Sequence, residues 1–139
     1  MYSKKITSEL YNVLRKASAG MSSTQAGSNP SSLVRITPIT NPSHPANGQH
    51  GLFASQNLAP DSFVICYIGY IHPQEEADPS SDYDLSLDRE LDIGIDATHM
   101  GNEARFINDY RGIGPAPNAE FRDVWVNVGQ GVLEKRIGV

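Results

Sequence analysis

Residues 95–110 read Ile-Asp-Ala-Thr-His-Met-Gly-Asn-Glu-Ala-Arg-Phe-Ile-Asn-Asp-Tyr, and the pair Pro117-Asn118 follows. We expect a helix over Asn102–Asn108, which would place Arg105 and Phe106 near its end, with Phe106 facing the core. Asn108 carries one amide donor pair and one acceptor, which suit the edge of a purine or the amino-acid end of a nucleotide-like ligand. The closing Pro-Asn pair predicts a turn. This stretch therefore predicts a ligand site next to a short helix.

A glycine-containing segment upstream of this stretch also has the character of a ligand loop. It runs from Gly48 to Gly69 and holds Gly51-Leu52-Phe53-Ala54, Leu58-Ala59-Pro60 and Val64-Ile65-Cys66-Tyr67-Ile68-Gly69. Glycine has no Cβ, so a ligand can approach its backbone closely. The segment predicts a tight loop around Gly48 and Gly51 that leads into a buried strand.

Together the two segments resemble the SET domain of protein-lysine methyltransferases. The matching positions of the first are, in chain order, Asp96-Ala97, Gly101-Asn102, Ala104 to Asn108 and Pro117-Asn118. The resemblance extends over about Val34 to Val139. It implies a mainly β fold of the SET type (β-clip), in which small sheets and short helices form a folded ribbon with a knot-like C-terminus. It also implies transfer of a methyl group from S-adenosylmethionine to the ε-amine of a protein lysine.

The resemblance further implies roles for individual residues. Tyr67, placed before Ile68-Gly69, would be the catalytic residue, as an aromatic wall of the channel for the substrate lysine. Its alternative is a core tyrosine with a satisfied hydroxyl. The residues implied to bind the methyl donor are Gly48, His50, Gly51, Leu52, Arg105, Phe106, Asn108 and Asp109. The protein would align donor and amine and would favour the neutral amine in an apolar channel.

Four features depart from the family pattern. Gln49 stands where the family has a glycine, Asp109 replaces a histidine, and Arg111 occupies the position of a zinc-binding cysteine in many relatives. The sequence also stops at Val139, before the family's Gly-Glu-Glu-Leu turn and the tyrosine that borders the transferred methyl. We therefore expect a C-terminally incomplete SET domain, with weak or no activity in residues 1–139.

Charge indicates the class of partner. The net charge is −5, and nine acidic side chains stand between Glu75 and Asp96, with Arg89 as the single base among them. This distribution disfavours direct binding of nucleic acid and favours a basic protein or a histone-tail peptide; a solvated acidic loop that only aids solubility is the alternative. No apolar run is long enough to span a membrane. We expect an intracellular protein, in the nucleus rather than the cytoplasm and associated with chromatin.

The single cysteine and the histidines bear on metal binding. Cys66 alone cannot form an internal disulfide or a thiolate-rich zinc site. The four histidines, His44, His50, His72 and His99, lack metal-ligand spacing, and we expect surface or turn roles for all of them. We therefore predict no bound metal.

The chain divides into an N-terminal extension and one folded domain. Residues 1–32 comprise a helix over Ser3–Ala19, ended by Gly20, and a flexible linker over Met21–Ser32; residues 33–139 form the SET domain. Three roles are open for this helix: it docks on the domain, it dimerises, or it frays. Strands are expected at Leu33–Ile39, Gly51–Ala54, Phe63–Ile71, Tyr83–Leu87 and Leu91–Ile95, and a hairpin at Ala119–Val128 and Val132–Val139. Exposed loops are expected at Asn41–Gly48 and His72–Ser81.

Two other functions compete with methyl transfer. A non-catalytic module could hold basic, histone-like peptides on the acidic region between Glu75 and Asp96. A mainly β hydrolase is weakly supported, because no serine lies in a Gly-x-Ser-x-Gly turn. The sequence leaves open the substrate protein, the target lysine, the degree of methylation and the oligomeric state.

Overall fold

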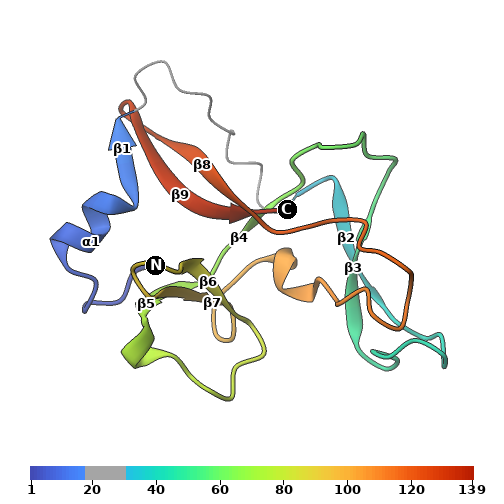
Figure 1. Ribbon diagram of the computed structural model, residues 1–139. Coiled ribbons are helices and arrows are strands. Elements are labelled where there is room, and N and C mark those ends of the chain that lie inside the picture. The colour runs from blue at the N-terminus through green and yellow to red at the C-terminus, as the bar shows by residue number, and fades with distance from the viewer. Residues whose placement is uncertain (18–30) are drawn as a thin grey trace.

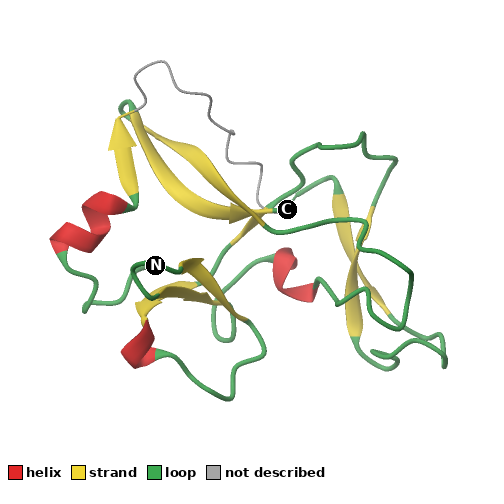
Figure 2. Ribbon diagram, in the orientation of Figure 1, coloured by secondary structure: helices red, strands yellow, loops and turns green. Residues whose placement is uncertain are grey.

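The protein is built from small antiparallel sheets joined by long loops (Figure 1). The computed structural model describes residues 1–17 and 31–139. Its helical elements are α1 (Ser8–Val13) and the short 3₁₀ helices η1 (Gln74–Glu76) and η2 (Glu103–Phe106). Its strands are β1 (Arg15–Ala17), β2 (Val34–Pro38), β3 (His50–Ala54), β4 (Cys66–Tyr67), β5 (Tyr70–Pro73), β6 (Asp84–Asp88), β7 (Ile93–Asp96), β8 (Arg122–Gly129) and β9 (Val132–Gly138). Figure 2 shows the dominance of strands and loops, so the expected mainly β fold is confirmed.

The largest sheet is organised around β9. β8 pairs with β9 along its length, from Arg122 opposite Gly138 to Gly129 opposite Val132. β1 and β4 share the other edge of β9, β1 at Val132–Glu134 and β4 at Ile137–Gly138. The strand that carries Tyr67 therefore lies in line with the N-terminal strand.

A second sheet has the order β5–β7–β6 and supplies much of the core. Both outer strands run antiparallel to β7. The core joins this sheet to β4, β9 and the N-terminal segment; its buried members are Leu14, Ile65, Tyr67, Ile71, Leu87, Ile93, Ile95, Ala97, Ala104 and Ile137. Because one core spans both sheets, the strand with Tyr67 is held from two sides.

The hairpin of β2 and β3 stands apart from these sheets (Figure 1). Its register runs from Val34 opposite Ala54 to Pro38 opposite His50. η2 lies against both strands. The hairpin thus meets the rest of the domain at the segment that the sequence marks as a ligand site.

The N-terminal helix is shorter than the spacing of apolar residues predicted. It begins after Thr7, whose hydroxyl accepts a hydrogen bond from the Leu10 amide at 3.3 Å, and it ends at Val13. Among the described residues, the prediction of a helix over Ser3–Ala19 is therefore wrong before Ser8 and from Leu14 to Ala17. The last two residues of that prediction, Gly20, and the linker as far as residue 30 lie outside the described residues.

The residues after this helix form a strand for a tertiary reason. Arg15–Ala17 pair with the free edge of β9, where unpaired backbone groups are available, and Leu14 is fully buried beside them. The Lys135 amide also donates to the Leu14 carbonyl at 2.8 Å. The N-terminal segment therefore packs on the domain.

The single strand predicted over Phe63–Ile71 is two strands. The chain pairs with β9 at Cys66–Tyr67 and then changes partner, because Tyr70–Pro73 pair with β7. The strand also runs further than predicted, so the exposed loop expected over His72–Ser81 is wrong at its start and contains the turn η1.

The surface or turn role expected for His72 is also wrong. This side chain is only 2% exposed. Its Nδ1 lies 3.0 Å from the Pro73 carbonyl oxygen and its Nε2 lies 3.1 Å from Asp84 Oδ1. A polar ring can be buried here because both nitrogens have partners.

The remaining predicted elements are confirmed within a few residues. The loop over Asn41–Gly48, the short strands and the C-terminal hairpin with its Gly-Gln-Gly turn are present. The helix expected over Asn102–Asn108 is the single turn η2. The Asn102 side chain caps that turn by accepting from the Ala104 amide at 3.3 Å.

Candidate functional site

The glycine segment and the signature segment are in direct contact. The Asn108 Nδ2 donates to the His50 carbonyl at 3.2 Å and to the Phe106 carbonyl at 3.4 Å. A Cβ at Gly51 would lie 3.0 Å from Asn108 Nδ2 and 2.8 Å from the Phe53 ring. Only glycine allows β3 to come this close to the Asn108 side chain.

Aromatic rings flank this contact. The rings of His50 and Phe106 meet edge to face with their centroids 6.3 Å apart. The His50 side chain is exposed, whereas Phe106 and Leu52 are half-buried. The contact therefore has an apolar side and an open side.

Gly48 and Asp109 lie at the ends of the two segments. Gly48 has a φ of 87°, its amide donates to the Ile39 carbonyl at 2.9 Å, and a Cβ there would meet nothing within 4 Å. The Asp109 carboxylate accepts the Arg111 amide and guanidinium, and these contacts lower the pKa of Asp109, the amide contributing most. Asp109 thus closes its own turn, and Gly48 leaves open space.

Arg105 extends toward Tyr83, and its guanidinium also lies 5.7 Å from the centroid of the neighbouring Phe106 ring. Its guanidinium lies over the Tyr83 ring, 4.3 Å from the centroid, and donates to the Thr98 carbonyl at 3.2 Å. The eight predicted residues are therefore divided: seven lie along the hairpin and the end of η2, and Arg105 lies on the side of Tyr67 and Tyr83.

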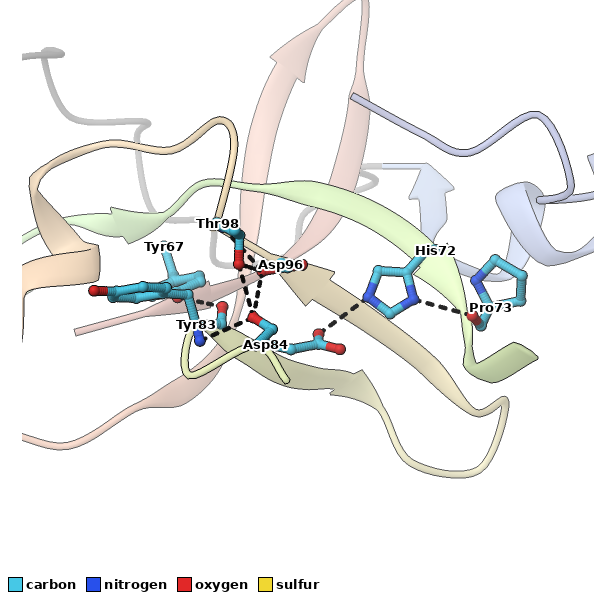
Figure 3. A network of polar contacts seen from close by, with 8 residues as sticks. Tyr67, His72, Pro73, Tyr83, Asp84, Asp96 and Thr98 are labelled. Carbon is cyan, nitrogen blue, oxygen red and sulfur yellow. Dashed lines mark hydrogen bonds and ion pairs between the residues drawn. The ribbon is translucent and has the colours of Figure 1, made fainter. Parts of the chain in front are cut away.

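Tyr67 is anchored in the core and is 3% exposed. Its hydroxyl donates to the Tyr83 carbonyl at 2.6 Å (Figure 3). The Phe121 ring meets its ring edge to face, with the centroids 5.8 Å apart. Burial, followed by the nearby charge of Asp96, raises the pKa of Tyr67 to about 12. The phenol is therefore neutral at physiological pH and acts as a hydrogen-bond donor.

Sequence reasoning missed Tyr83 and Phe121 as neighbours of Tyr67. Tyr83 contributes a backbone carbonyl, which leaves no signal in the sequence. Phe121 follows Pro117-Asn118 closely, and an aromatic residue at that place was the one available signal. Its side chain remains 43% exposed although it touches the buried Tyr67 ring.

The described residues hold neither a cluster of metal ligands nor a membrane-spanning helix. Across residues 1–17 and 31–139, no three His, Cys, Asp or Glu side chains gather so that they could hold a metal ion. In the same residues, no helix has the length and hydropathy to cross a membrane.

Comparison with known proteins identifies the family. The family model of the SET domain matches residues 49–136, a range that contains the signature segment and all of the glycine segment except Gly48. A search of curated proteins found no match. Members of this family are typically lysine methyltransferases that use S-adenosylmethionine. The match spans well over half of the chain and agrees with its small antiparallel sheets, and the chain belongs to the SET-domain family.

Proposed function

We propose that this chain is an S-adenosylmethionine-dependent protein-lysine methyltransferase. One observation carries the proposal: Asn108 in the signature segment donates to the His50 carbonyl in the glycine segment, 58 residues away. The family resemblance implies a role in binding the methyl donor for both segments. Their contact supports one shared donor site.

The side chains at this contact suit an adenosyl ligand. Asn108 is exposed, and within the described residues its amide oxygen accepts no hydrogen bond. The exposed His50 ring and the Phe106 ring each offer an aromatic face for stacking, and Gly48 leaves room for a ligand to reach the backbone. These residues would hold the donor, which supplies an electrophilic methyl group on a sulfonium sulfur.

Tyr67 and Phe121 would form walls of the channel for the substrate lysine. The two rings touch each other, so an amine would lie beside them, where they exclude water and their apolar surface favours its neutral, nucleophilic form. The Tyr67 phenol remains protonated because burial raises its pKa to about 12. It therefore orients the amine and does not remove its proton.

A basic segment of a protein, such as a histone tail, fits the surface charge. Among the nine acids between Glu75 and Asp96, some are taken up internally: Asp84 lies against His72, and Asp88 pairs with Lys135 at 3.0 Å. Glu75, Asp78, Asp82, Glu90 and Asp92 remain exposed. These exposed carboxylates favour a basic substrate over nucleic acid. A histone tail is such a substrate, and it would place the protein in the nucleus.

Donor binding is the first test. Titration of residues 1–139 with S-adenosylmethionine in a calorimeter should give saturable binding at one site per chain. Asn57→Ala, at an exposed position of the same domain, serves as the matched control for Asn108→Ala. Absence of binding by the wild-type chain would contradict the proposed donor site.

Methyl transfer is the second test. The family's closing tyrosine is not among residues 1–139, so the assay uses these residues joined to a segment with the family's Gly-Glu-Glu-Leu turn and tyrosine. With radiolabelled donor and a pool of core histones, the longer polypeptide should transfer label and Tyr67→Ala should abolish transfer. Residues 1–139 alone should give negligible transfer.

A non-catalytic module for basic peptides is the competing function. It predicts histone-peptide binding that falls when Asp78 and Asp82 are changed to asparagine, with no transfer by either polypeptide. Transfer by the extended polypeptide excludes this reading.

A further inference from the structure

A buried polar pair crosses the β5–β7–β6 sheet outside the candidate donor site. His72 on β5 and Asp84 on β6 approach to 3.1 Å between Nε2 and Oδ1. The His72 ring is 2% exposed, and the Asp84 carboxylate is also largely covered. The two strands do not pair with each other, because β7 lies between them.

Gly94 in the central strand makes this pair geometrically feasible. Gly94 stands opposite His72 in one ladder and opposite Ser86 in the other. A Cβ on Gly94 would lie 2.7 Å from His72 Cε1 and 2.8 Å from Asp84 Oδ1. The absent side chain is therefore the space through which the imidazole and the carboxylate meet.

The pair adjoins the group that anchors Tyr67. Asp84 follows Tyr83 directly, and the Tyr83 carbonyl accepts both the Tyr67 hydroxyl at 2.6 Å and the Ala97 amide at 3.1 Å. On the other side of Tyr83, the Ser81 hydroxyl donates to Asp96 at 2.9 Å. Figure 3 shows the Asp84–His72 contact beside the group of Tyr67, Tyr83, Asp96 and Thr98, with Pro73 on the far side of the imidazole.

We propose that His72 and Asp84 are positioning residues for Tyr67, acting through the Tyr83 carbonyl. The pair fixes where β6 lies relative to β5, and hence where the carbonyl that receives the Tyr67 hydroxyl is placed. The catalytic part of this inference rests on the proposed function, in which the Tyr67 ring orients the substrate amine. Misplacement of a wall of that channel lowers the rate of transfer without changing the donor site, which lies on the β2–β3 hairpin.

A buried polar pair of this kind is a poor source of stability. Burying two polar side chains costs desolvation, and apolar residues of similar volume often stabilise a core equally well. A pair of this kind instead favours one arrangement of neighbouring strands, because the donor and acceptor must meet. That property suits a contact whose purpose is to place a carbonyl.

The test uses conservative variants with matched exposed controls. Asp84→Asn keeps an oxygen acceptor and removes the charge, and His72→Gln keeps one side-chain N–H donor. Asp82→Asn and His99→Gln are the controls, since both wild-type side chains are exposed. The protein is labelled with ¹³C at tyrosine Cζ, which gives one NMR signal for each of six tyrosines, and Tyr67→Phe assigns the signal of Tyr67.

We expect Asp84→Asn and His72→Gln to shift the Tyr67 signal, while the controls leave it in place. In the extended polypeptide, kcat should fall by about tenfold to a hundredfold with the donor KM unchanged. A variant that unfolds collapses all six signals together, and Asp84→Ser, a smaller hydroxyl acceptor, then takes its place. An unmoved Tyr67 signal in folded variants overturns the positioning role.

The outcome separates this inference from the proposed function. If the extended wild-type polypeptide transfers no methyl group but the variants still shift the Tyr67 signal, the methyltransferase function is rejected. The structural coupling between the buried pair and Tyr67 is then retained. Active wild-type protein whose kcat is unaffected by both variants rejects the positioning role alone. Gly94→Ala should reproduce the shift, because its Cβ would occupy the space between the pair.

Discussion

The sheet β5–β7–β6 and the β2–β3 hairpin differ in burial, and each holds part of the candidate site. Ile71, Ile93 and Ile95 of the sheet are at most 1% exposed, whereas Ile36 and Phe53 of the hairpin are 41% and 42% exposed. Tyr67 is anchored against the sheet, and the predicted donor residues other than Arg105 lie along the hairpin and the end of η2. The substrate side is therefore part of the cooperative core, and the donor side lies on an open surface.

This difference implies that the two sides respond differently to substitution. A change next to Tyr67 disturbs side chains that pack from two sheets, so it should alter the free energy of unfolding. A change on the hairpin should alter ligand affinity and leave unfolding nearly unchanged. The following substitutions, from the largest expected effect to the smallest, test that division.

Glu134→Ala should have the largest effect, on the core side. The Glu134 carboxylate is 1% exposed, pairs with Arg15 and Arg136 at 2.7 Å each, and accepts the Tyr2 hydroxyl. Removing it leaves two guanidinium groups without their buried partner, which should cost about 3–5 kcal/mol of unfolding free energy. Urea denaturation measures this loss.

The control for that change is Glu120→Ala, where an exposed carboxylate pairs with Arg122. Its effect should stay below about 1 kcal/mol. Equal effects of the two substitutions would mean that residues 1–17 do not dock on β9 as described.

Asn108→Ala should weaken the donor side without weakening the fold. The side chain is exposed and its bonds are to the His50 and Phe106 carbonyls. Loss of a polar contact to the donor should reduce binding by about 1–3 kcal/mol, measured by calorimetry. We expect the midpoint of urea denaturation to stay within error of the wild-type value. A large loss of stability would instead place Asn108 in the core.

The sequence predicted local features well and long-range ones poorly. The hairpin at Gly129-Gln130-Gly131 follows from turn residues between two apolar runs, and it is present. The hairpin depends on a pattern that is contiguous in the chain. The contact of Gly51 with Asn108 is long-range, and only the family resemblance of the two segments pointed to it.

The misses share a tertiary cause. Arg15–Ala17 continue a helical pattern but pair with the open edge of β9, which no local window contains. His72 precedes a proline in an acid-rich stretch, which suggests an exposed position. The ring is nevertheless buried, because it contacts Asp84 on another strand and Gly94 leaves room for it. The Tyr67 hydroxyl donates to the backbone carbonyl of Tyr83, and a backbone group is not signalled by the type of residue that carries it.

Acid titration should distinguish two aspartates, one from each region. Burial alone would raise the pKa of Asp96, but hydrogen bonds from Thr98 and Ser81 outweigh it and lower the pKa. As the pH falls, the unfolded chain takes up a proton on Asp96 before the folded chain does. The contribution of Asp96 to stability is therefore complete above the ordinary aspartate pKa of about 3.9 and is lost as the pH falls through the lower pKa of the folded state.

Asp96→Asn should therefore flatten the acid limb of stability, measured as the urea midpoint between neutral pH and the acid transition. Asp109, whose pKa is lowered mainly by the Arg111 amide, has an exposed carboxylate that solvent screens. Asp109→Asn should leave the acid limb nearly unchanged. Equal flattening by the two substitutions would contradict the division between core and hairpin.

Arg111→Ala should have the smallest effect, because the Asp109–Arg111 pair is open to water on both sides. Their side chains are 54% and 75% exposed. Exposed pairs contribute little and are screened by salt, so thermal unfolding should shift little at low salt and not at all at high salt. The Asp109 carboxylate would still accept the amide of residue 111, so the turn after Asn108 should persist. A larger, salt-independent loss would show that this turn folds as one unit with the core, and the donor side could then no longer be treated as an independent surface.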